Sequence, residues 1–161
     1  MHSGPGQLVE APDGDRLYIT NANSIYSWSR GQRRVLASTD LPVHVGWLAV
    51  SPDGESVVLS DGGQAFDSSG SGKLFVYDQL LSLQKMIDLS PASTNGAPVV
   101  TNQLAFSRDG RWLFAAAGTP SAGPLFGFQP SQVLVIDART FEFVRAIPLN
   151  DFGSVMLFPQ R

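Results

Sequence analysis

The stretch Leu48-Ala-Val-Ser-Pro-Asp-Gly54 decides the fold, because nearly the same stretch occurs three times in this chain of 161 residues. Its counterparts are Leu8-Val-Glu-Ala-Pro-Asp-Gly14 and Leu104-Ala-Phe-Ser-Arg-Asp-Gly110. Each copy runs from a short apolar segment into Asp-Gly, a pair that tolerates the backbone angles of tight hairpin turns. Each copy therefore predicts a strand, a tight turn and a second strand.

The pattern continues beyond each turn and predicts an all-β chain in which helix is absent or limited to a turn. The second strands are expected at Arg16–Thr20, Ser56–Ser60 and Trp112–Ala116, the third at Ile25–Trp28, Leu74–Tyr77 and Val133–Ile136, and the fourth at Arg33–Ala37, Lys85–Leu89 and Val144–Leu149. A four-stranded propeller blade needs roughly 40–50 residues, and the copies begin at residues 8, 48 and 104. Four antiparallel strands per unit, repeated with the same turn chemistry, favour β-propeller blades. The alternative is a β-sandwich with chance Asp-Gly turns, which does not require its hairpins to repeat in register.

The third copy carries a family resemblance. The segment from Val133 to Leu149, which reads VLVIDARTFEFVRAIPL, resembles a blade of the YVTN-type β-propeller repeat family. The turns Ser51–Gly54 and Ser107–Gly110 resemble the same group and the related WD-like and TolB-type repeats. The resemblance implies blades arranged around a channel, in a family that includes binding proteins, surface and periplasmic proteins, lactonases and amine dehydrogenase subunits. It is specific for the fold and does not choose among these functions.

The first copy departs from the pattern at two positions. Glu10 replaces the apolar residue of the other two copies, and Ser29 replaces the aspartate that ends the third strand at Asp78 and Asp137. Both changes predict that the first blade is distorted or lies at an interface.

Three blades form an incomplete ring, because propellers have about four to eight blades. The boundaries expected are a flexible leader at 1–6, blades at 7–46, 47–103 and 104–153, and the opening strand of a fourth blade at 154–161. Such an arc exposes sheet faces and invites association. We expect a protein partner, further blades of a longer protein or a second copy of the chain to complete the ring. The segment Ser154–Phe158 is then expected to contact another chain or the first blade.

Composition excludes several classes of function. The formal net charge is −3 and the only basic pair is Arg33-Arg34, so a nucleic-acid surface is not expected. The absence of cysteine excludes disulfides, thiolate catalysis and cysteine-ligated metals. No apolar run approaches the roughly 20 residues of a membrane span. A chain without cysteine suits cytosol and periplasm alike, whereas the family resemblance favours a periplasmic or extracellular location.

Long connections at 61–72, 90–103 and 117–131 are expected on one face of the blades, and such extensions often mark a binding face. Neutral variation in loop length is the alternative. For the apolar residues of 117–131, a second alternative is packing over the mouth of the channel. The candidate binding residues on this face are His44, Asp61, Phe66, Asp67, Asn95, Asn102, Leu125, Phe126 and Phe128. The segment 61–72 lacks the spaced acidic ligands of an EF-hand, so we expect no metal.

Catalytic chemistry has little support in these residues. The histidines are His2, in the leader, and His44, and the aspartates of the Asp-Gly turns are better explained by turn geometry than by acid–base work. We therefore expect no catalytic residue and no cofactor. The interpretation is a non-catalytic module for protein binding or complex assembly. The alternative is the partial scaffold of a propeller enzyme, lactonase-like or amine dehydrogenase-like, whose catalytic groups lie outside this chain.

The apolar positions of these strands also predict the core. The side chains expected to be mostly buried are Leu48, Val50, Val57, Leu59, Leu104, Phe106, Leu113, Val135 and Ile147.

Overall fold

A computed structural model describes residues 6–21, 23–41, 44–61, 72–93, 99–120 and 128–149. The first sheet holds β1 (Leu8–Glu10), β2 (Arg16–Asn21), β3 (Ser24–Ser29) and β4 (Arg34–Asp40). The second holds β5 (Val45–Val50), β6 (Ser56–Asp61), β7 (Lys73–Asp78) and β8 (Leu83–Asp88). The third holds β9 (Val100–Phe106), β10 (Trp112–Pro120), β11 (Phe128–Asp137) and β12 (Glu142–Pro148).

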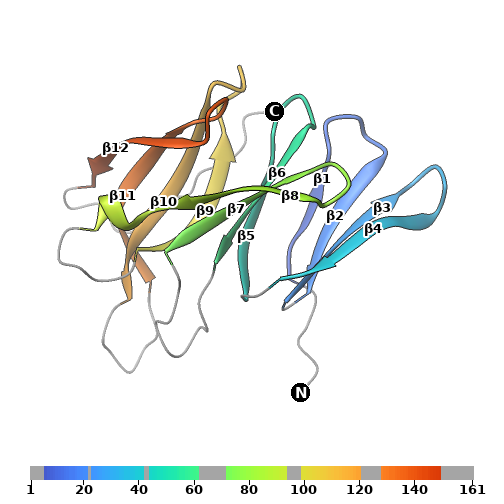
Figure 1. The fold of residues 1–161 in the computed structure, drawn as a ribbon, viewed down its shortest axis with the longest axis horizontal. Coiled ribbons are helices and arrows are strands. Elements are labelled where there is room, and N and C mark those ends of the chain that lie inside the picture. Colours follow the sequence, from blue (N-terminus) through green and yellow to red (C-terminus); the bar gives the residue numbers. More distant parts are fainter. Residues whose placement is uncertain are drawn as a thin grey trace.

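Each sheet keeps its four strands in sequence order, and every neighbouring pair is antiparallel. Figure 1 shows the three sheets side by side, from the blue first sheet through the green second sheet to the orange and red third sheet. The first strand of the second sheet, β5, packs against β1 and β9, so the first strands converge at one edge of the stack. The single helical element in the described residues is the short 3-10 helix η1 (Ser90–Ala92). The predicted all-β fold of four-stranded antiparallel blades is confirmed.

The three sheets repeat each other in detail. A register shift falls after Ser27 in β3, after Val76 in β7 and after Val135 in β11, which are equivalent positions. The first sheet has the same strand order as the other two. Glu10 and Ser29 therefore leave the strand order of the first blade regular, so the blade is not distorted in this respect, and the alternative, a place at an interface, stays a prediction.

The Asp-Gly turns form as predicted. Gly54 has a φ of 76°, in the left-handed region that glycine adopts without a steric cost, and Gly14 and Gly110 do the same in their sheets. The Ser51 hydroxyl donates to the Asp53 carboxylate and accepts the amide N–H that opens β6, at 2.9 Å. These contacts, which Ser107 repeats with Asp109 and Trp112 in the third sheet, fix the register of the first hairpin in the second and third sheets.

The core follows the two-residue period of the strands, because successive side chains point to opposite faces of a sheet. We call the face that packs on the preceding sheet the leading face and the opposite one the trailing face. In the second sheet the buried leading-face residues are Leu48, Val57, Leu59, Phe75 and Tyr77. Its buried trailing-face residues, which pack on the third sheet, are Ala49, Val58, Leu74, Val76 and Ile87.

Most of the predicted core is confirmed, and one prediction is wrong. Ile147 is 39% exposed because it lies on β12, the outer strand of the third sheet. Val50 and Phe106 are half-buried, and the other predicted core residues are buried. The segment Ser154–Phe158 lies outside the described residues.

The predicted connection at 117–131 is also shorter than expected. Strand β10 runs on to Pro120, and β11 already begins at Phe128. The Ala-Ala-Gly-Thr-Pro run that ends β10 has low strand propensity. It nevertheless pairs with β11 along its whole length, and the register shifts once, at a bulge between Ala117 and Gly118. Cross-strand pairing overrides the local preference here.

Candidate functional site

The strand order divides the connections between two opposite faces. Because neighbouring strands are antiparallel, the connections that follow the second and fourth strand of each sheet leave on one face, which we call the connection face. The Asp-Gly turns and the turns between third and fourth strands lie on the opposite face, which we call the turn face. The predicted binding residues that the structure describes, His44, Asp61, Asn102 and Phe128, belong to strands or connections of the connection face.

His44 and Asp61 lie at one corner of the second sheet. His44 is exposed and directly precedes β5, whereas Asp61 ends β6 and is only 5% exposed. The register places Val45 opposite Asp61, so the two candidates flank the same strand pair. The structure therefore brings these two predicted residues together.

Two more candidates lie in the third sheet. Asn102 occupies the bulge of β9, between residues that pair with Ala116 and Ala117 of β10. Phe128 opens β11 opposite Pro120, at the connection-face end of the hairpin. The remaining predicted residues, Phe66, Asp67, Asn95, Leu125 and Phe126, lie outside the described residues.

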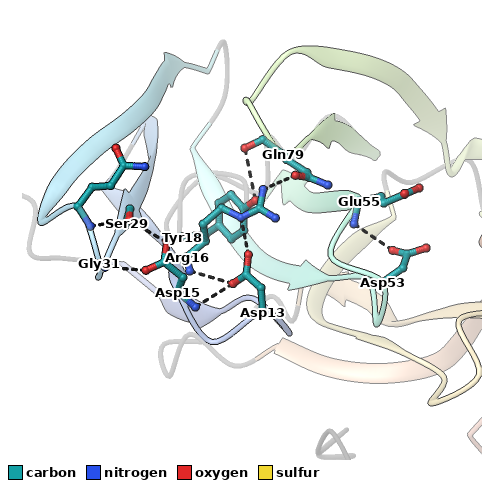
Figure 2. Close-up of polar contacts among 10 residues, drawn as sticks. Asp13, Asp15, Arg16, Tyr18, Ser29, Gly31, Asp53, Glu55 and Gln79 are labelled. Atoms are coloured by element: carbon teal, nitrogen blue, oxygen red, sulfur yellow. Dashed lines mark hydrogen bonds and ion pairs between the residues drawn. The ribbon is translucent and has the colours of Figure 1, made fainter.

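The turn face carries a polar network that sequence reasoning missed (Figure 2). The Asp13 carboxylate accepts the backbone N–H groups of Asp15 at 2.9 Å and Arg16 at 3.0 Å, and the Arg16 Nε at 2.7 Å. The backbone N–H of Arg16, and next its guanidinium, lower the pKa of Asp13 to about 2. The same guanidinium also donates to the side chain of Gln79 in the second sheet. Asp13 thus orients a residue that bridges two sheets.

Asp15 joins the two turns of the first sheet. Its carboxylate accepts the Gly31 N–H at 2.6 Å and the Ser29 hydroxyl at 2.8 Å, and these hydrogen bonds lower its pKa. Ser29 therefore replaces the strand-end aspartate of the other copies by donating to an aspartate of the neighbouring turn. The sequence signal for this contact is a second aspartate, Asp15, directly after the Asp-Gly turn, together with Ser29 at the position of Asp78 and Asp137.

The other turn aspartates have equally fixed roles. The Ser51 hydroxyl lowers the pKa of Asp53, and the Ser107 hydroxyl lowers the pKa of Asp109. A carboxylate whose pKa is lowered stays ionised at neutral pH and is a poor proton donor. The prediction that these aspartates serve turn geometry is confirmed by their hydrogen bonds.

No group of three or more histidine, aspartate or glutamate side chains lies close enough to hold a metal ion within the part of the chain that the structure describes. Over the same residues, no helix has the length and apolar character needed to cross a membrane.

Comparison with known proteins shows the fold. The chain is similar to hydrazine synthase of Kuenenia stuttgartiensis, with a TM-score of 0.70 and 23% identity over 94% of this chain and 38% of that chain. It is also similar to U3-55K and to the WD40 repeats of RRP9, each with a TM-score of 0.65 and 18% identity over 92% of this chain and 40% of the other. No family model and no curated protein matches the sequence.

At these identities the likeness establishes architecture and nothing more. The chain is built from propeller blades, and it spans 38% to 40% of the length of these solved chains. The YVTN-type resemblance stays a prediction.

Proposed function

We propose that this chain is a non-catalytic β-propeller module that binds a protein or assembles into a larger complex, with other blades or chains completing the ring. The observation that supports this function is an open end of the stack. Leu8, on the leading face of the first sheet, is 63% exposed, whereas its counterpart Leu48 in the second sheet is 5% exposed. The matching faces of the second and third sheets are packed against a neighbour.

The size of the hydrophobic effect supports association. Burial of apolar surface contributes about 25 cal/mol per Å², so a sheet face left in water forfeits several kcal/mol. This loss is large beside a net stability of about 5–15 kcal/mol for a whole domain. An assembly that covers the face is therefore favoured over the isolated arc.

Native mass spectrometry and sedimentation velocity at low micromolar concentration test the proposal. We expect the chain to self-associate or to co-purify with a partner, and the free chain to bind an apolar dye such as ANS. A monomer of 17.3 kDa that unfolds cooperatively and binds no dye would contradict the proposal.

We place protein binding on the connection face, where His44 and Asp61 share a corner. His44 is exposed, so its replacement leaves the core intact. The absence of native cysteine allows a photo-crosslinker to be attached at a single position, as in His44→Cys. Crosslinks to the partner from this position, and none from Asp13→Cys on the turn face, are expected. The reverse pattern would move the binding site to the turn face.

The alternative is that the chain is the partial scaffold of a propeller enzyme. One of the solved chains with this architecture belongs to a hydrazine synthase, so the architecture is compatible with this alternative. The turn aspartates with lowered pKa values are committed to hydrogen bonds, so catalytic groups would come from other blades or chains. Activity in a purified complex that survives His44→Ala and Asp61→Asn together would place the catalytic groups outside these candidates.

A further inference from the structure

The leading faces of the three sheets present equivalent residues at five inner positions, whereas Glu10 of the first sheet stands where Val50 and Phe106 stand in the other two. In the first sheet Leu17 pairs with Trp28 and Ile19 with Tyr26, just as Val57 pairs with Tyr77 and Leu59 with Phe75 in the second. The five inner leading-face positions are Leu8, Leu17, Ile19, Tyr26 and Trp28 in the first sheet, Leu48, Val57, Leu59, Phe75 and Tyr77 in the second, and Leu104, Leu113, Ala115, Leu134 and Ile136 in the third. Every one of these positions is apolar or aromatic in all three sheets.

Burial separates the first sheet from the other two. All five residues are at most 5% exposed in the second sheet and at most 9% exposed in the third. In the first sheet none is buried, and Leu8 is 63% exposed. The first sheet thus has the apolar residues of a blade interface on its leading face, and no sheet in the described part of the chain covers that face.

A contact between proline and glycine accompanies each formed interface. A Cβ placed on Gly54 would lie 3.6 Å from Cδ of Pro12 in the preceding sheet, and one placed on Gly110 would lie 3.8 Å from Cδ of Pro52. The Asp-Gly turns of the second and third sheets therefore lie against the proline of the sheet before them. At Gly14 the corresponding neighbour is only Glu10 of the same turn, at 3.9 Å. Gly14 therefore lacks a contact with a proline that directly precedes the Asp-Gly turn of a neighbouring blade.

The third sheet of this chain does not contain such a proline. In the third sheet Arg108 stands where Pro12 and Pro52 stand in the first two. On the trailing face of that sheet, Ala116 and Val135 are buried, Phe114 and Val133 are half-buried and Ile147 is 39% exposed. A second copy of this chain, docking through its third sheet, lacks the proline.

We propose that the leading face of the first sheet is the docking site for a four-stranded antiparallel blade that differs from this chain's third blade in having a proline directly before its Asp-Gly turn. Its trailing face carries apolar side chains like those of Val58, Leu74 and Val76. This inference rests on the proposed assembly function and adds the surface and the kind of partner. The stacking continues the interfaces already formed between the three sheets.

Single-cysteine labelling tests the docking site, because the chain has no native cysteine. Ile19→Cys reports on the leading face of the first sheet, and Leu59→Cys is the matched buried control in the second. The probe blade is an extra copy of residues 6–44, which contains Pro12, joined ahead of residue 5 so that the natural spacing between sheets is kept. In the extended chain the cysteine replaces Ile19 of the parent sequence, and the added blade keeps its isoleucine.

We expect Ile19→Cys to react rapidly with a maleimide in the chain alone. In the extended chain the reaction is expected to slow about tenfold or more, since labelling then requires the docked blade to open. Pro12→Arg in the extra copy, which reproduces Arg108, is expected to restore part of the reactivity. Leu59→Cys stays slow in both proteins.

Equal reactivity of Ile19→Cys in both proteins would overturn the proposal. Protection that grows with the concentration of the chain alone would assign the face to a second copy and would also overturn it. Association that leaves Ile19→Cys reactive would retain the proposed function and reject this docking surface. If the extended chain does not fold, the melting temperatures of Leu17→Ser and Val57→Ser decide instead, because an open face predicts a loss only for Val57→Ser.

Discussion

Arg16, at the start of β2, donates a hydrogen bond from its guanidinium to the side-chain carbonyl of Gln79, which follows β7 in the second sheet (Figure 2). The Tyr18 hydroxyl lies 3.4 Å from the backbone carbonyl of the same glutamine. The turn between the third and fourth strands of one blade is thus held by the first hairpin of the blade before it. The stack is joined at its turn face by polar contacts as well as by its apolar core.

A double-mutant cycle of Arg16→Gln and Gln79→Ala measures this bridge. We expect a coupling of about 0.5–1.5 kcal/mol in the free energy of unfolding, the usual net value of one hydrogen bond. Urea unfolding of the four proteins provides the measurement. The exposed pair of Arg34 and Gln32, joined at 2.8 Å within one sheet, is the control and is expected to couple more weakly. Equal coupling in both cycles would show that the bridge adds nothing between the sheets.

The lowered pKa of Asp13 predicts a pH dependence of stability. Hydrogen bonds from the Arg16 backbone and guanidinium lower the pKa from 3.8 to about 2, so the folded state binds this proton more weakly than the unfolded state. The stabilising contribution is complete above pH 3.8 and is lost as the pH falls toward 2. Asp13→Asn is therefore expected to show a flatter decline of melting temperature over this range. The same decline in both proteins would contradict the assignment.

Sequence reasoning predicted the blades because local signals and the global fold agree. Asp-Gly turns at Gly14, Gly54 and Gly110 mark each hairpin, and apolar periodicity marks the strands that flank them. The end of β10 was missed because Ala117 and Gly118 have low strand propensity and are held by pairing with β11. Pairing of that kind depends on a partner strand, which no local signal shows.

The candidate site also has a part that strand order predicts and a part that depends on how two sheets pack. His44 and Asp61 could be placed on one face from strand order alone, and the structure puts them at one corner. The bridge from Arg16 to Gln79 could not be predicted, because it joins residues far apart in the sequence through the angle between two sheets. An open face follows from the incomplete ring that the sequence predicts, and the exposure of Leu8 beside the burial of its counterpart Leu48 locates it on the first sheet.

The interface between the second and third sheets predicts a large effect of a core truncation. Leu134 is fully buried there, so Leu134→Ala removes side-chain contacts and leaves a cavity. We expect the free energy of unfolding to fall by about 2–5 kcal/mol. Leu83→Ala is the matched control on an outer strand, where the side chain is 49% exposed, and should change stability by less than about 1 kcal/mol. Chemical denaturation followed by tryptophan fluorescence measures both. Similar losses for the two variants would contradict the packing of the sheets.

Substitutions at Gly14 measure the cost of an unfavourable backbone conformation without a steric clash with neighbouring residues. Its φ of 71° lies in the left-handed region, and a Cβ there would meet only the Glu10 carboxylate, at 3.9 Å. Gly14→Ala is therefore expected to cost about 1–2 kcal/mol through backbone strain alone. Gly14→Asn should cost less, because asparagine tolerates this conformation better than alanine. Thermal unfolding of the two variants beside the parent chain gives the comparison. An alanine variant as stable as the asparagine variant would mean that the turn relaxes to a negative φ, and that the Asp-Gly turn is not what fixes the register of the first hairpin.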